Sequence, residues 1–176
     1  MVASSAVSVE QHRSTSPTVL GFAILTVSDS RGHGDDRSGR LLRELAAAAG
    51  HRIESSSIVP DEVAAIRQAA GQMIALPGVD VVVVTGGTGL APRDRTLEAL
   101  APSFEKPIEG FGELFRMLSY QQVGAAAMLS RAAAGLIGGR AVFLLPGSPA
   151  AVTLAMEKLI LPEAGHLLGQ VRRSPG

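Results

Sequence analysis

The chain has 176 residues, and its 16 basic and 16 acidic side chains cancel at pH 7, so a nucleic-acid binder or an anionic-membrane binder, which normally carries a basic excess, is not expected. The absence of cysteine excludes disulfides, thiolate metal sites and cysteine nucleophiles. Hydrophobic residues make up 46% of the chain and charged residues only 18%, which favours an oligomer that covers apolar surface, with buried helices crowded by small residues as the alternative.

Residues 1–17 lack the apolar run of a signal peptide and are expected to form a disordered tail. One domain is expected over residues 18–170, with a C-terminal tail at 171–176. No run reaches the roughly 18 uninterrupted apolar residues that a membrane helix needs. The lack of a leader and of cysteine suits a cytoplasmic protein.

Strands and helices are expected to alternate over the first hundred residues. Residues 19–30 form a continuous apolar run that ends in serine and aspartate, which indicates a strand buried on both faces. A helix follows, with Ser38 as its N-cap and Gly50 at its end. The next elements are a strand at 51–59 near the sheet edge, a helix at 60–76 and a strand at 79–85. This alternation predicts an α/β fold with a mostly parallel sheet and helices on both faces.

The second half of the chain is less regular. Residues 110–122 look helical, whereas residues 125–136 fit either a helix or a strand. A short buried strand is expected at 140–147. A long helix is expected from Ser148 toward residue 168, because serine caps well and proline is tolerated at the first helical position. Pro162 is expected to kink or divide that helix.

The first candidate site is a glycine-rich loop at the end of the strand at 79–85. This TGGTG loop consists of Thr85, Gly86, Gly87, Thr88 and Gly89. Open α/β sheets bind ligands at the carboxyl ends of their strands, and glycines let backbone N–H groups approach an anion closely. The loop matches neither the Walker loop nor the dinucleotide fingerprint. The alternative is a tight turn that needs positive φ angles.

Two acidic residues form a second candidate group. Asp61 and Asp94 each follow a predicted strand, and together they could reach one divalent cation, since Mg²⁺ prefers one or two carboxylates plus phosphate oxygens and water. The alternative for Asp61 is a helix N-cap. The alternative for Asp94 is a surface acid paired with Arg93 or Arg95.

The strand at 140–147 also ends in a candidate site. Pro146, Gly147 and Ser148 lead into a helix start, which offers N–H groups to phosphate or is simply a good capping motif. Ser130 could add a hydroxyl and Arg131 a cation, although a salt bridge at a subunit interface would also explain an arginine in an apolar stretch. The four histidines show no metal-ligand spacing.

Five stretches carry a family resemblance over residues 19–168: VSDSR, VPDE, VVVVTGGTGLAPRDRTLEAL, IEGFGELFRMLSYQQVGAAAMLSRAAAGL and FLLPGSPAAV. In this order they resemble the MoaB/Mog family of molybdenum cofactor biosynthesis, whose active members are molybdopterin adenylyltransferases, and the fourth is closer to the MoaB branch. The resemblance implies a three-layer α/β/α sandwich and a trimer, or a hexamer of two trimers. It also implies a phosphate- and pterin-binding pocket beside the TGGTG loop, and the family's two key aspartates match Asp61 and Asp94.

The reaction implied by this resemblance is Mg²⁺-dependent transfer of AMP from ATP to the terminal phosphate of molybdopterin, giving adenylyl-molybdopterin and pyrophosphate. Asp61 and Asp94 would hold Mg²⁺ and the TGGTG loop would hold phosphate. The pterin or the nucleotide would be positioned by Ser130, Gly147 and Ser148. Two alternatives stay open. One is a non-catalytic molybdopterin carrier or assembly partner for other molybdenum cofactor enzymes, and the other is general nucleotide hydrolysis.

Overall fold

The computed structural model describes residues 17–29 and 35–172. Most of the two predicted tails, residues 1–16 and 173–176, and part of the predicted polar loop at 30–34 lie outside these ranges. No helix within the described ranges is long and apolar enough to cross a membrane.

A six-stranded sheet forms the centre of the domain, with strand order β2-β1-β3-β6-β5-β4. Its strands are β1 (Gly21–Val27), β2 (Arg52–Val59), β3 (Val81–Thr85), β4 (Lys106–Pro107), β5 (Ala133–Ile137) and β6 (Arg140–Leu145). The neighbours β2, β1, β3 and β6 are parallel, whereas β5 is antiparallel to both β6 and β4. The predicted mostly parallel sheet is confirmed, and so is the edge position of β2.

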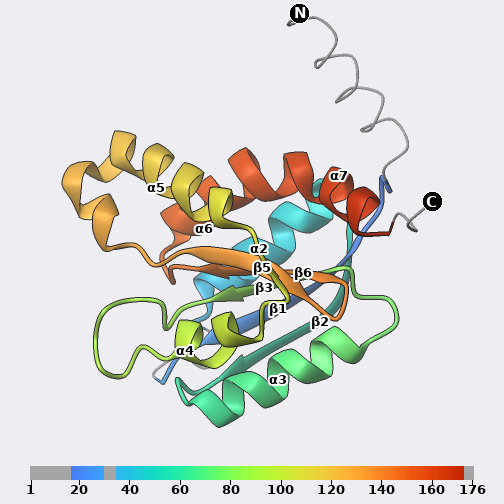
Figure 1. Ribbon diagram of the computed structural model, residues 1–176, viewed down its shortest axis with the longest axis horizontal. Helices are drawn as coiled ribbons and strands as arrows, with labels where there is room; N and C mark the ends of the chain where they lie inside the picture. Colours follow the sequence, from blue (N-terminus) through green and yellow to red (C-terminus); the bar gives the residue numbers. More distant parts are fainter. Residues whose placement is uncertain (1–16, 30–34, 173–176) are drawn as a thin grey trace, which may run out of the picture.

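Helices cover both faces of this sheet (Figure 1). The helices α2 (Arg37–Ala48), α5 (Glu109–Val123), α6 (Pro149–Ala155) and α7 (Leu161–Val171) lie on one face, and α3 (Val63–Ala75) and α4 (Thr96–Leu100) lie on the other. Short helical turns occupy Ala101–Ser103, Gly124–Leu129 and Met156–Ile160. The three-layer α/β/α sandwich is therefore confirmed.

Alternation along the strands builds two cores. Val81 and Val83 of β3 face the cluster under α2, α5, α6 and α7, whereas Val82 and Val84 face the cluster over α3 and α4. All four valines are fully buried. Because successive side chains point to opposite faces, a strand covered on both sides has to be apolar throughout.

The start of α2 differs from the prediction. Asp36, not Ser38, is the N-cap, and its Oδ1 accepts a hydrogen bond of 2.9 Å from the Gly39 N–H. The second oxygen, Oδ2, accepts one from the Thr26 hydroxyl at 3.0 Å. Ser38 lies in the first turn, where its hydroxyl donates to the carbonyl of Gly147 at 2.9 Å. The helix therefore begins earlier because a buried carboxylate ties it to β1.

The long C-terminal helix is divided as predicted. Ser148 caps α6, and its Oγ accepts from the Ala151 N–H at 3.2 Å. A π-helical segment, Met156–Ile160, separates α6 from α7, which has Pro162 in its first turn. Because Pro162 has no N–H and its ring would strike the preceding turn of an α-helix, the wider π turn relieves the clash while the helical path continues.

The ambiguous segment at 125–136 splits into both kinds of structure. Its first part forms the helical turn Gly124–Leu129, and its last residues form β5. Antiparallel pairing with β6 draws an alanine-rich stretch into the sheet, so tertiary contact overrides the helical preference of alanine here.

Candidate functional site

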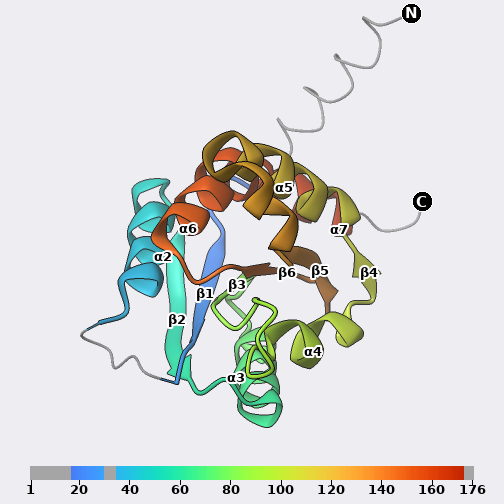
Figure 2. The ribbon, with the colours of Figure 1, turned by 90° about the vertical axis from the view of Figure 1, so that its left-hand side faces the viewer.

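A cleft of about 710 Å³ opens where the four parallel strands end. Figure 2 looks onto this end of the sheet. The lining comes from the segments that follow β1, β2, β3 and β6, and from the turn before β5. The chain passes from β2 across β1 to β3, so the strand order changes direction beside the cleft. Ligands of open α/β sheets bind at such a switch point.

Ten of the eleven predicted site residues line this cleft: Asp61, Gly86, Gly87, Thr88, Gly89, Asp94, Ser130, Pro146, Gly147 and Ser148. The exception is Thr85, which is fully buried at the end of β3. Its hydroxyl donates to the carbonyl of Pro146 at 3.1 Å, so it joins the β3 and β6 loops from beneath. Thr85 therefore supports the cleft from beneath and does not line it.

The TGGTG loop is held by its carbonyl groups. Thr96 donates its hydroxyl to the carbonyl of Gly86 at 2.8 Å and its N–H to the carbonyl of Gly87 at 2.9 Å. Within the described part of the chain, the N–H groups of Gly87, Thr88 and Gly89 donate no hydrogen bond to protein. Three successive N–H groups are therefore available to an anion in the cleft.

The glycines also make room for protein atoms. A Cβ at Gly86 would lie 2.2 Å from the carbonyl oxygen of Val27, and a Cβ at Gly87 would lie 2.5 Å from Asp61 Oδ2. Gly86 and Gly87 have φ angles of +97° and +62°, so the alternative of a turn with positive φ is correct for both. A Cβ at Gly89 would lie 2.6 Å from Oδ2 of Asp94. The loop thus has to be glycine-rich for the two carboxylates to lie against it.

Each of the two carboxylates uses one oxygen to hold backbone. Asp61 Oδ1 accepts from the Arg95 N–H and Asp94 Oδ2 from the Ala91 N–H, both at 2.9 Å. The remaining oxygens, Asp61 Oδ2 and Asp94 Oδ1, accept no hydrogen bond from the described residues. Glu62, not Asp61, occupies the N-cap position of α3, so the N-cap alternative for Asp61 is wrong.

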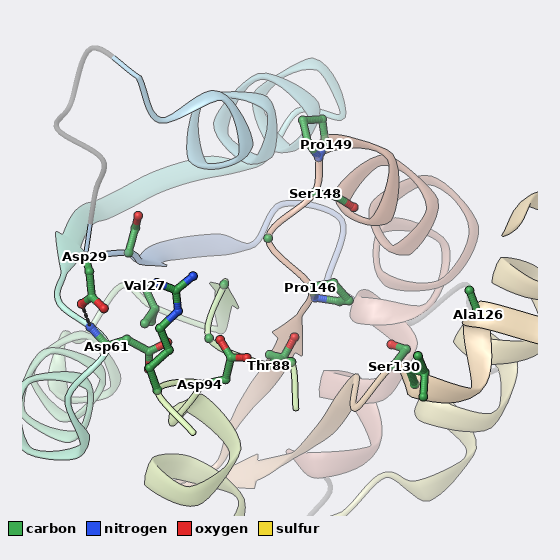
Figure 3. A pocket seen from close by; sticks show the side chains of 17 residues that line it. Val27, Asp29, Asp61, Thr88, Asp94, Ala126, Ser130, Pro146, Ser148 and Pro149 are labelled. Carbon is green, nitrogen blue, oxygen red and sulfur yellow. Dashed lines mark hydrogen bonds between the residues drawn. The ribbon is translucent and has the colours of Figure 1, made fainter. Parts of the chain in front are cut away.

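A third carboxylate, which the sequence interpretation left out, completes this side of the cleft. Asp29 follows β1, and its Oδ1 accepts from the Asp61 N–H at 2.8 Å. Figure 3 shows Asp29, Asp61 and Asp94 along one side of the cleft, with Ser130 and Ser148 toward the other. An acid at the end of a neighbouring parallel strand was the signal that could have identified Asp29.

Crowding of these carboxylates affects their proton affinity. Burial raises the pKa of Asp61, and the charges of Asp94, Asp29 and Glu98 raise it further, while the hydrogen bond from the Arg95 N–H opposes them. The ionised form of Asp61 is therefore disfavoured in this site, and a bound cation would stabilise it.

The free carboxylate oxygens fit a magnesium ion whose other coordination positions are filled by a ligand and water. No three acidic or histidine side chains among the described residues are arranged to hold a metal by themselves. Asp61 and Asp94 nevertheless each present one carboxylate oxygen without a protein partner. One or two carboxylates with phosphate oxygens and water is the coordination that Mg²⁺ prefers.

The two described histidines lie away from the cleft lining. His51 accepts from the Leu20 N–H and stacks on Phe22, and burial lowers the pKa of its imidazole. His166 pairs with Glu163 on α7. His12 and His33 lie outside the described residues.

Arg131 connects three parts of the site. Its Nε donates to the carbonyl of Thr88 at 3.0 Å, and one Nη donates to the carbonyl of Asp94 at 3.4 Å. The other Nη pairs with Glu98 Oε1 at 2.5 Å, and this bond lowers the pKa of Glu98. The ion pair of Arg131 thus lies within one chain, and a subunit interface is not needed to explain it.

Comparisons with known proteins find one family over most of the chain. The family model described as "Probable molybdopterin binding domain" matches residues 23–166. Molybdenum cofactor biosynthesis protein B of Halalkalibacterium halodurans is 46% identical over 165 residues, which cover 93% of this chain and 97% of that protein. A crystal structure of a molybdenum cofactor biosynthesis protein B superposes with a TM-score of 0.87 at 48% identity, covering 91% of this chain and 100% of that one. The tungsten cofactor synthesizing protein MoaB from Pyrococcus furiosus follows with a TM-score of 0.83 at 40% identity, covering 89% and 99%.

Proposed function

Because the chain belongs to the MoaB/Mog family of molybdenum cofactor biosynthesis proteins, we propose that it is a molybdopterin adenylyltransferase. An oxygen of the terminal phosphate of molybdopterin attacks the α-phosphorus of ATP. A new P–O bond forms, the bond from the α-phosphorus to the bridging oxygen breaks, and pyrophosphate leaves. The products are adenylyl-molybdopterin and pyrophosphate.

One observation carries this proposal. The cleft combines three backbone N–H groups without protein partners, at Gly87, Thr88 and Gly89, with two carboxylates that each keep one oxygen unbonded. N–H groups bind phosphate, while carboxylates repel it unless a cation lies between them. A site that contains both suits a metal-bound polyphosphate.

The residues of the chain have separate roles in this reaction. Asp61 and Asp94 would hold Mg²⁺, which when bound neutralises phosphate charge and polarises the phosphoryl oxygens. The TGGTG loop binds phosphate oxygens through its N–H groups, and Arg93, which lines the cleft, adds a positive charge. A phosphate monoester is already ionised near neutral pH, so positioning and charge neutralisation are the main requirements and no general base is needed.

The remaining residues of the cleft fit the rest of the two substrates. Ser130 and Ser148 lie at the side opposite the carboxylates, with Leu129 and Ala126 as apolar neighbours. A polar group beside apolar surface suits a flat heterocycle, either the pterin or the adenine. We place the reaction in the cytoplasm, where ATP is available.

The test is an assay for pyrophosphate released by the purified protein with Mg²⁺, ATP and molybdopterin. Asp94→Asn is expected to lower the rate at least ~100-fold, the scale of a lost electrostatic stabiliser, while molybdopterin still binds. Glu44→Gln, an exposed acid on α2, is the matched control and should leave the rate unchanged. Undiminished turnover by Asp94→Asn would remove that carboxylate from the mechanism.

A non-catalytic molybdopterin carrier or assembly partner for other molybdenum cofactor enzymes is the second candidate. Asp61 and Asp94 each fix a backbone N–H, so both have a structural role that would persist without catalysis. Molybdopterin binding without pyrophosphate release in the same assay would favour this candidate. Release of phosphate from ATP in the absence of the pterin would instead indicate nucleotide hydrolysis.

Self-association is part of the proposal, as a trimer or a hexamer of two trimers. Large apolar side chains are exposed along α5 and the turn that follows it: Leu114, Met117, Tyr120, Val123, Met128 and Leu129. A helix with apolar residues on its outer face as well as its buried face is typical of one that packs against another subunit. Light scattering of the purified protein measures the assembly, and a monomer would contradict it.

A further inference from the structure

Arg131 lies between the helical turn Gly124–Leu129 and β5, and its side chain contacts other parts of the protein. Its side chain is about 25% exposed, and its Nε and both Nη groups donate to protein oxygens. Arg131 does not line the cleft. Its guanidinium is therefore engaged with the walls of the site rather than with the space inside it.

Two of the oxygens that Arg131 binds belong to loops with different roles. The Thr88 carbonyl belongs to the TGGTG loop, and the Asp94 carbonyl belongs to the loop that carries a carboxylate. The third partner is Glu98, which lies on α4 directly after that loop. In the described part of the chain, Arg131 is the only side chain from outside residues 85–98 with hydrogen bonds to both loops.

We propose that Arg131 is a positioning residue that sets the spacing between the phosphate-binding N–H groups and the Asp94 carboxylate. The planar fork of a guanidinium donates in several fixed directions at once, whereas the ammonium of lysine is a point charge on a flexible stem. The assignment of a nucleotide to the site rests on the proposed function. The spacing of the two loops does not.

The experiment compares Arg131→Ala and Arg131→Lys with Arg52→Ala. The control removes another arginine–glutamate pair, Arg52 with Glu54 at 2.8 Å, from the opposite end of the sheet. Hydrogen exchange of the 94–96 amides, pyrophosphate binding, and kcat and KM for adenylyl transfer are measured in each variant.

Arg131→Ala is expected to speed exchange at the Thr96 amide, which donates to Gly87 O, at least about tenfold, the scale of one lost charge-assisted hydrogen bond. Pyrophosphate affinity should fall by a similar factor. The kcat should fall about 100-fold, as for a displacement of about 1 Å, with a smaller change in KM for ATP. Arg131→Lys should resemble Arg131→Ala more than the wild type, because it keeps the charge and loses the fork.

Several outcomes would overturn the inference. Wild-type exchange and kcat in Arg131→Ala would do so, as would full rescue by Arg131→Lys, since charge alone would then suffice. If Arg131→Ala fails to fold, Glu98→Gln, at an exposed position, should give the same changes on a smaller scale, and no change would contradict the proposal. If the wild type makes no adenylyl-molybdopterin, the proposed function fails, while exchange and pyrophosphate binding still test Arg131.

Discussion

Gly89→Ala should separate the role of the Asp94 carboxylate from the stability of the loop. Gly89 is exposed and its φ angle is not positive, so alanine meets no backbone strain there. The added Cβ would lie 2.6 Å from Asp94 Oδ2, whereas ordinary contact begins at 3.4 Å. The carboxylate therefore has to move by about 0.8 Å, which is the difference between these two distances.

Two costs follow from this displacement. The hydrogen bond from the Ala91 N–H to Asp94 Oδ2 is lost. Such a bond contributes about 1 kcal/mol to the stability of the folded chain. A loss of this size lowers the melting temperature of a domain of this length by about 2–4 °C. The effect on turnover is larger, because a displacement of about 1 Å at a reacting centre lowers the rate about 100-fold.

The assay combines thermal unfolding with pyrophosphate release. Gly71→Ala is the matched control, because Gly71 lies in α3, has no atom within 4 Å of an added Cβ and has no positive φ angle. The control should be more stable than the wild type by about 0.5–1 kcal/mol, since alanine favours a helix interior over glycine, and equally active. A Gly89→Ala protein with full turnover would refute the view that contact with the loop fixes the carboxylate.

Two further predictions concern the acidic groups. Burial and neighbouring carboxylates raise the pKa of Asp61, so the folded protein binds this proton more tightly than the unfolded chain, and the stabilisation is lost as pH rises through the folded pKa. Asp61→Asn should therefore be more stable than the wild type in urea at about pH 7.5, with the difference shrinking toward about pH 4, and a variant that is less stable at the higher pH would contradict this. Asp36→Ala should lower the free energy of unfolding by about 2–4 kcal/mol, because α2 loses its cap and the buried Thr26 hydroxyl loses its acceptor. Asp36→Ser, which keeps a capping oxygen for the Gly39 N–H, should recover part of this loss in the same urea titration.

Much of the fold could be predicted because local signals agreed with burial. The valine run of β3 is apolar on both faces, and a strand between two helical layers has to be. The start of α2 could not be predicted in the same way. Asp36 and Ser38 are both good capping residues, and the choice depends on a contact with the Thr26 hydroxyl of β1, a different element of the fold.

The candidate site shows the same division. The convergence of Asp61 and Asp94 on the TGGTG loop follows from parallel strands that end at one edge of the sheet. The burial of Thr85 and the contacts of Arg131 could not be predicted, because each depends on carbonyl oxygens that a sequence does not display. The glycines of the TGGTG loop serve two purposes, since they allow positive φ angles and leave room for carboxylates. The close approach of the carboxylates depends on the folded structure and could not be predicted from the sequence.

The central position of β6 determines when the cleft can exist. β6 is the last strand in the sequence, yet it lies between β3 and β5, and the loop that follows it supplies a wall of the cleft. During synthesis the earlier segments emerge first, but they enclose nothing until this final strand inserts. A chain that ends before β6 lacks the wall formed by Pro146, Gly147 and Ser148, so the complete cleft depends on insertion of the last strand.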